Sequence, residues 1–242
     1  MRAALKFGRL PWLLAIPLLA VAARAQPADA PVDAPAISVY HETAVVSSYL
    51  WRGMVLNDSV SLQPGLVIGW RGLSISSWQS FSRRVPHGQM WTSSDMNLEY
   101  ARSVRKFTAS VGYWRYHYPD MPRDEGETSH EFYAGVAHKS WLNPSLKFST
   151  DVSLGGGHYW FGSVAHGFEL SSRLTLNTSL GVGLNQHYYQ TQTTISDVDG
   201  VASLDIRLTR HLVISPGFVQ MVGHRSLFGR HHAFSLKVSL AN

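Results

Sequence analysis

The sequence predicts an all-β protein, a transmembrane antiparallel up-and-down β-barrel of about twelve strands. From Ile37 onward, short runs of alternating apolar and polar residues are separated by turn residues. The connections between these runs alternate between long and short along the chain. Charged residues make up only 15% of the chain, against roughly 25% in soluble domains. This deficit indicates a large surface that does not face water.

The N-terminal 25 residues predict a cleaved secretory signal peptide. They contain a basic start, an apolar run over residues 10–23 and an Ala-Arg-Ala end at 23–25. The alternative is a membrane anchor, but a spanning helix needs about 20 residues, and Pro11 and Pro17 interrupt this shorter run. We therefore expect a signal peptide over 1–25 and a Gram-negative outer-membrane location.

Residues 26–36 predict a flexible leader, because they are rich in Pro, Ala and Asp without periodicity. The barrel is then expected over 37–242. Four of the basic residues lie in the predicted signal peptide and account for most of the formal net charge of +5. We therefore expect no nucleic-acid partner. The chain has no Cys, which excludes disulfides and thiolate metal ligands.

The strands are predicted in order from period-two alternation and from the turn residues between them. In the last one, Phe234, Leu236 and Val238 share one face while Ser235 and Lys237 share the other. The twelve expected strands are 37–53, 61–70, 73–81, 91–101, 106–118, 129–139, 146–155, 158–170, 173–187, 198–209, 211–222 and 231–240.

The connections divide the predicted sheet into two different ends. Those after even-numbered strands are short, such as Arg71-Gly72, and those after odd-numbered strands are long. The exception is the short join at Gly156-Gly157. Outer-membrane barrels have this asymmetry, with short periplasmic turns and long external loops.

The apolar face of each strand is expected to face lipid, with outer-membrane lipids as partners. The opposite face carries Ser, Thr, Gly, Asn and isolated charges, which suits a hydrated interior. A secreted β-sandwich or lipocalin-like barrel is the soluble alternative. Aromatic residues near the predicted strand ends favour the membrane, where such girdles mark the interfaces. They are Tyr49, Trp51, Trp70, Trp91, Tyr116, Tyr118, Trp141, Tyr159, Trp160, Tyr188 and Tyr189.

The first predicted hairpin resembles the TorF family of predicted porins, small outer-membrane proteins of Gram-negative bacteria. That family opens with an S-x-Y-x-[FW]-R-G element, followed by a Q-x-G-L strand. The matching residues here are Ser47, Tyr49, Trp51, Arg52 and Gly53 for the first element, and Gln63, Gly65 and Leu66 for the second. The resemblance implies a β-barrel that passes solutes, with the substrates largely undefined.

The interior of the barrel holds the candidate functional residues. Strand parity selects Asp95, Asn97, Glu99, Lys147, Asp151, Asp205, Arg207 and Lys237 as lumen-lining. These side chains either line a path for small polar solutes or pair across the lumen and occlude it, and their mixed charges leave the sign of any charge selectivity open. Arg52 is expected either at the external mouth or, more simply, at the membrane interface packed on aromatic rings. The oligomeric state is left open.

Catalysis and metal binding have little support, and we expect no cofactor and no enzyme. His231 and His232 are adjacent, so on a strand they point to opposite faces. A lipid-modifying enzyme would need a pair such as His138 and Ser140, which parity places at the periplasmic end. A non-conducting adhesion barrel, acting through loops 119–128 and 188–196, is the other alternative.

Overall fold

The computed structural model describes residues 37–82, 90–119, 127–189, 191–223 and 229–242. The predicted signal peptide and leader lie outside these ranges. The strands are β1 (Ser38–Val46), β2 (Tyr49–Trp51), β3 (Met54–Asn57), β4 (Ser61–Trp70), β5 (Leu73–Ser82), β6 (Trp91–Val104), β7 (Phe107–His117), β8 (Thr128–His138), β9 (Ser145–Asp151), β10 (His158–Glu169), β11 (Leu174–Gln186), β12 (Thr193–Arg207), β13 (Leu212–Gly223) and β14 (Arg230–Ala241). The described ranges contain no helix that is long and apolar enough to cross a membrane.

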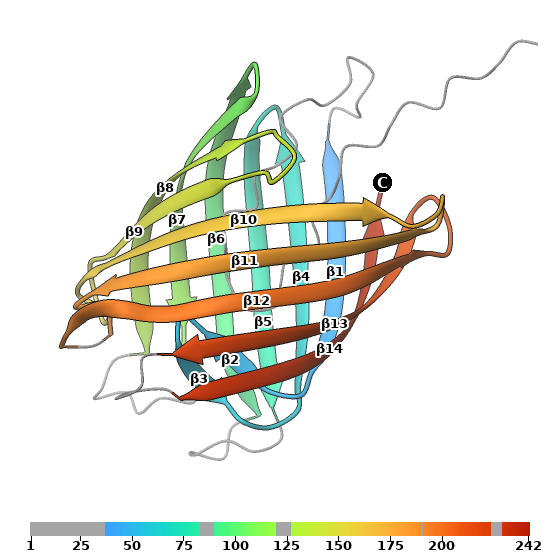
Figure 1. Ribbon diagram of the computed structural model, residues 1–242. Helices are drawn as coiled ribbons and strands as arrows, with labels where there is room; N and C mark the ends of the chain where they lie inside the picture. The colour runs from blue at the N-terminus through green and yellow to red at the C-terminus, as the bar shows by residue number, and fades with distance from the viewer. Residues whose placement is uncertain (1–36, 83–89, 120–126, 190, 224–228) are drawn as a thin grey trace, which may run out of the picture.

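Twelve of these strands form one closed barrel, in the order β1-β14-β13-β12-β11-β10-β9-β8-β7-β6-β5-β4 (Figure 1). Every neighbouring pair is antiparallel, and β1 closes the ring by pairing with both β14 and β4. Closure leaves no strand edge in the wall, so all wall strands have hydrogen-bonding neighbours on both sides. The predicted fold class is confirmed.

The two faces of the wall divide as the alternation predicts. On β4, Leu66, Ile68 and Trp70 are 40–51% exposed on the outside, whereas Ser61 and Gln63 are each 1% exposed on the inside. An outward apolar face with an inward polar face is the reverse of a soluble barrel packed around an apolar core. The expectation that the apolar faces point outward is confirmed.

The connections at the two ends of the barrel differ in length. Those from β4, β6, β8, β10 and β12 to the next strand have two to six residues, and we call that end the short-turn end. The opposite, long-loop end has connections of six to fourteen residues. One of the two-residue turns is Arg71-Gly72, with φ of 48° and 88°, typical of a hairpin turn of type I′. A Cβ on Gly72 would lie 2.5 Å from the Ala101 carbonyl oxygen, so glycine is required there.

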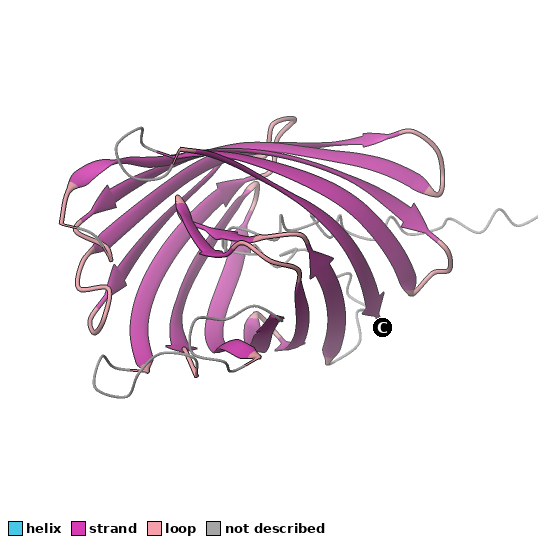
Figure 2. Ribbon diagram, turned by 90° about the horizontal axis from the view of Figure 1, so that it is seen from below, coloured by secondary structure: helices cyan, strands magenta, loops and turns pink. Residues whose placement is uncertain are grey.

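The first predicted strand, 37–53, is wrong in its second half. The wall strand β1 ends at Val46, and residues Tyr49–Asn57 form a separate two-stranded sheet, β2–β3. Figure 2 shows this short hairpin inside the ring of long strands. We call Tyr49–Asn57 the inner hairpin. β12 also starts at Thr193 rather than at 198, because its pairing with β11 continues through a register shift beside Gly183.

Several aromatic residues assigned to the membrane girdles lie inside the barrel instead. The outward ones fit a girdle, since Trp70, Trp91, Trp141 and Trp160 are 37–67% exposed. By contrast, the residues at most 7% exposed are Tyr49, Trp51, Tyr116, Tyr159 and Tyr188. On a wall strand, parity decides the side, and Tyr116 shares the inward face of β7 with Trp114.

Candidate functional site

The inner hairpin places an arginine in the middle of the barrel interior. The side chains of Leu50 and Trp51 are 0% and 3% exposed, so their burial holds the hairpin inside. Its turn is Arg52-Gly53, with φ of 47° and 82°, again a pair of left-handed residues. A Cβ on Gly53 would lie 2.8 Å from the carbonyl oxygen of Ser196 on β12. The tip of the hairpin therefore lies against β12 of the barrel wall.

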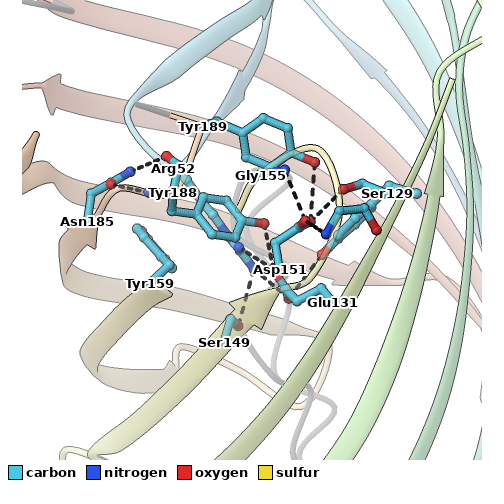
Figure 3. Close-up of polar contacts among 12 residues, drawn as sticks. Arg52, Ser129, Glu131, Ser149, Asp151, Gly155, Tyr159, Asn185, Tyr188 and Tyr189 are labelled. Carbon is cyan, nitrogen blue, oxygen red and sulfur yellow. Dashed lines mark hydrogen bonds and ion pairs between the residues drawn. The ribbon is translucent and has the colours of Figure 1, made fainter. Parts of the chain in front are cut away.

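Arg52 forms a buried ion pair with Glu131 of β8 (Figure 3). Its Nη1 lies 2.6 Å from Glu131 Oε2, and its Nη2 lies 3.0 Å from Oε1, which is a bidentate geometry. Nη2 also approaches the Ser149 hydroxyl at 3.5 Å. The two side chains are only 3% and 0% exposed. We correct the expectation for Arg52, which packs on aromatic rings but within the barrel and not at the membrane interface.

Aromatic rings surround this ion pair. The Arg52 guanidinium lies 4.8 Å from the ring centroid of Trp51, 4.6 Å from that of Tyr159 and 4.7 Å from that of Tyr188. Such cation–π contacts favour a desolvated arginine. Tyr188 also donates its hydroxyl to Glu131 Oε2 at 2.5 Å, and Tyr116 donates to Oε1 at 3.2 Å. Protein groups alone therefore supply two donors to each oxygen of the Glu131 carboxylate.

A second polar cluster orders the wall beside the hairpin. Asp151, the last residue of β9, accepts hydrogen bonds from the Ser129 hydroxyl at 2.6 Å and from the Gly155 amide at 2.9 Å. The Tyr189 hydroxyl lies 3.4 Å from the same carboxylate. Tyr188 is fixed in turn by two bonds with Asn185, at 2.7 and 2.8 Å. Figure 3 shows both clusters side by side.

The two halves of the barrel interior differ in packing. On the inward face of β11, Gly181, Gly183 and Asn185 are buried beside the inner hairpin, whereas Thr175, Asn177 and Ser179 toward the short-turn end are only partly buried. The same change occurs along β10 and β12. The inner hairpin therefore fills the long-loop half of the lumen, and the wall of the other half over β10–β12 is more accessible.

The lumen-lining candidates occupy several environments. The structure buries six of the eight: Asp95, Asn97, Glu99, Lys147, Asp151 and Lys237. Tyr133 joins three of these, since it donates to Glu99 at 2.8 Å, accepts from Asn97 at 3.0 Å, and its ring lies 3.8 Å from the Lys147 ammonium. Asp205 is partly buried and bonds the Ser215 hydroxyl, and Arg207 is exposed at the end of β12. Their role in conduction stays a prediction.

The TorF-like motif residues divide between three places. Tyr49, Trp51, Arg52 and Gly53 build the inner hairpin. Ser47 joins the hairpin to the wall, because it exchanges two hydrogen bonds with the Phe234 backbone on β14. On β4, Gln63 and Gly65 are buried on the inward face, whereas Leu66 is exposed on the outward face.

Sequence reasoning missed the partners of Arg52. Glu131 shares a face with Tyr133, opposite the outward Phe132, so the alternation in β8 was a usable signal. Asp197 was missed because the strand that carries it was expected to begin at 198, whereas Asp199 lies within the expected strand and shares the parity of Asp205, so the alternation was a usable signal for it. Within the part of the chain that the structure describes, no group of three or more His, Asp or Glu side chains is arranged to hold a metal ion.

Comparisons with known proteins agree with the barrel. A family model described as "Bacterial protein of unknown function (Gcw_chp)" matches residues 29–239. The NanC porin structure aligns with a TM-score of 0.56 at 12% identity, covering 85% of this chain and 99% of that one. The KdgM porin in complex with disordered oligogalacturonate aligns with a TM-score of 0.53 at 10% identity, covering 84% and 98%.

A third similar structure is an outer membrane channel from Pseudomonas putida F1. It aligns with a TM-score of 0.52 at 7% identity, covering 85% of this chain and 94% of that one. No curated protein matches the sequence. At these identities the structural likeness establishes the fold, which is that of small outer-membrane barrels.

Proposed function

The chain belongs to the Gcw_chp family of bacterial proteins of unknown function, and because that family supplies no activity, we propose one from the barrel. The protein is a porin of the Gram-negative outer membrane that admits small polar solutes by passive diffusion. The charged and polar interior of a closed barrel carries this proposal. A barrel that only anchored the chain in lipid would gain nothing from burying so many ionisable groups, each of which is costly to desolvate.

The uneven packing of the interior supports a narrow passage. The partly buried Thr175, Asn177 and Ser179 lie on the inward face of the short-turn half of the lumen. The inner hairpin occupies the other half and sets the constriction. A twelve-stranded barrel is intermediate between small barrels filled by side chains and large ones with open channels. We therefore infer a low conductance, suited to small solutes.

The TorF resemblance gains physical content from the inner hairpin. Its Tyr-x-Trp-Arg-Gly element supplies the tip that reaches Glu131 and Ser196. We propose that this element is the constriction of a TorF-like porin. The signal peptide over 1–25 and an outer-membrane location are part of the same proposal.

A non-conducting barrel is the second candidate, because the Arg52–Glu131 ion pair ties the hairpin across the lumen. A lipid-modifying enzyme has weaker support. Ser140 and His138 lie at the short-turn end, at the close of β8, and the His138 ring packs against Phe107. External lipid substrates would be at the opposite end.

Single-channel recording in planar bilayers tests the proposal. The refolded protein is expected to give small, discrete conductance steps. A variant with residues 49–57 replaced by a Gly/Ser linker of equal length is expected to give larger steps, because the constriction is removed. Heat-modifiable migration on a gel confirms that both barrels are closed.

The outcomes separate the candidates. Current through the linker variant alone identifies a barrel that the hairpin seals, which contradicts the porin proposal. If neither folded barrel gives current, the proposal that the protein conducts is contradicted. Equal step sizes in the two proteins would show that the inner hairpin is not the constriction.

A further inference from the structure

The interior carries far more acidic than basic side chains. Among residues that the structure describes, the acidic side chains on the inward face that are buried or partly buried are Glu42, Asp95, Glu99, Glu131, Asp151, Asp197, Asp199 and Asp205, and the basic ones in the interior are Arg52, Lys147 and Lys237. With every group ionised, eight negative charges face three positive ones. The outward basic residues do not offset this excess inside a low-dielectric wall.

The three basic side chains are already engaged with specific partners. Arg52 is paired with Glu131, and Lys237 Nζ lies 3.6 Å from Glu42 Oε2. Lys147 lies over the Tyr133 ring, whose hydroxyl bonds Glu99. The acidic side chains named in these contacts are all glutamates, and the aspartates of β6, β9 and β12 are not among them.

The remaining aspartates are held by dipoles and not by charges. Asp95 accepts from the Ser93 hydroxyl at 2.7 Å, Asp205 accepts from Ser215 at 2.6 Å, and Asp151 accepts from hydroxyl and amide groups. Over the described ranges, none of these three has a basic side chain within 4.0 Å. Hydrogen bonds orient a carboxylate but leave its net charge to act on whatever enters the lumen.

Two aspartates on β12 form the strongest local concentration of negative charge. Asp197 and Asp199 are two residues apart on one inward face and are 0% and 6% exposed. Asp197 accepts from the Tyr159 hydroxyl at 2.9 Å and from Ser196. Asp199 Oδ1 is buried and has no hydrogen-bond partner in the described chain. This inward pair of carboxyl groups therefore sets the local electric field beside β12.

On the premise that the barrel conducts as proposed above, we propose that it prefers cationic solutes and that Asp197 and Asp199 contribute most to this preference. Because both carboxyl groups are almost fully buried, they act on solutes through the electric field in the lumen and not through direct contact. Rings of acidic side chains confer cation selectivity on channels in the same way. The ligand class is therefore small organic cations and alkali cations.

The test is the reversal potential of single channels in a potassium chloride gradient. The wild-type barrel is expected to be cation-selective. Asp199→Asn and the double variant Asp197→Asn/Asp199→Asn are expected to lower the cation-to-anion permeability ratio by roughly twofold or more. Asparagine keeps the shape of each side chain. In the double variant, the Tyr159 hydroxyl can still donate to the amide oxygen that replaces the Asp197 carboxylate.

The matched control for Asp199→Asn is Asp58→Asn, which removes one negative charge from an exposed position. It is expected to leave the permeability ratio unchanged. An anion-selective or non-selective wild-type current overturns the proposal while leaving the porin function intact, as does a control that shifts selectivity as much as the β12 variants. A folded barrel without current overturns the porin function and this proposal together.

Discussion

Arg52 and Glu131 are 79 residues apart in the chain, yet they meet in a bidentate ion pair with Nη1 and Oε2 2.6 Å apart. One comes from the inner hairpin, which follows the first wall strand, and the other from β8. The pair therefore fastens a short hairpin to the closed wall. Because both side chains are buried, the contact is costly to break.

Removing one member of this pair should destabilise the barrel strongly. Glu131→Gln leaves the Arg52 guanidinium buried without a counter-charge, which costs about 3–5 kcal/mol. The measurement is denaturant unfolding in lipid vesicles, followed by the fluorescence of the tryptophans. A double variant, Arg52→Met/Glu131→Met, removes both charges and should recover much of the loss. A double variant that is no more stable than Glu131→Gln would contradict this account.

Tyr188→Phe tests the hydroxyl that completes the shell of Glu131. The variant keeps the ring that packs on Arg52 but loses the 2.5 Å hydrogen bond. Loss of a bond to a charged group costs roughly 1.5–3 kcal/mol, and the same unfolding assay measures it. Tyr100→Phe is the control, because Tyr100 is 47% exposed on the outer face. Equal effects of the two substitutions would refute a special role for Tyr188.

Gly53→Ala should disturb the tip of the inner hairpin. Its φ of 82° disfavours an L side chain, and the added Cβ would lie 2.8 Å from the Ser196 carbonyl oxygen. Strain of roughly 1–2 kcal/mol comes from the left-handed backbone alone, and the clash adds to it. Gly156→Ala is the matched control, since its φ is 56° but the nearest heavy atom is 3.8 Å away. We expect larger and more variable conductance for Gly53→Ala only.

The loss of folding stability caused by a new charged residue should depend on which face of the barrel wall the residue occupies. Leu180 is 54% exposed on the outer face of β11, and Ser179 beside it faces the lumen. Leu180→Arg is expected to cost about 2–4 kcal/mol, as arginine does on the lipid face near the middle of the membrane. Ser179→Arg should fold with far less penalty. The measurement is folding yield and unfolding free energy in vesicles, and equal penalties would contradict the assignment of faces.

Period-two alternation was sufficient to predict the barrel wall. On β4 the order of Leu66, Ile68 and Trp70 against Ser61 and Gln63 identifies the two faces without a structure, because side chains alternate by geometry. The same parity selected interior residues such as Asp95 and Lys147. A local sequence pattern is therefore sufficient to predict the regular strands of the barrel wall.

The inner hairpin could not be predicted in this way. The run from Val45 through Trp51 contains no glycine or proline, so it resembles one continuous strand. Its departure into the lumen depends on burial of Leu50 and Trp51 against side chains from distant strands, which is a tertiary effect. Alternation in β8 can place Glu131 on the inward face, but only the closed ring brings Glu131 and Tyr188 to Arg52.

The location of the inner hairpin also constrains how the molecule is assembled. It follows β1, and β1 forms the seam with β14, the last strand. The hairpin contacts Glu131 on β8 and Ser196 on β12, and both residues come after the hairpin in the chain. The ring must therefore either wrap around a hairpin that is already in place or admit it through one rim after the seam has formed. A changed rate of barrel closure in Glu131 variants would indicate that the hairpin is in place before the seam forms. An unchanged rate would indicate that the hairpin enters after the seam has formed.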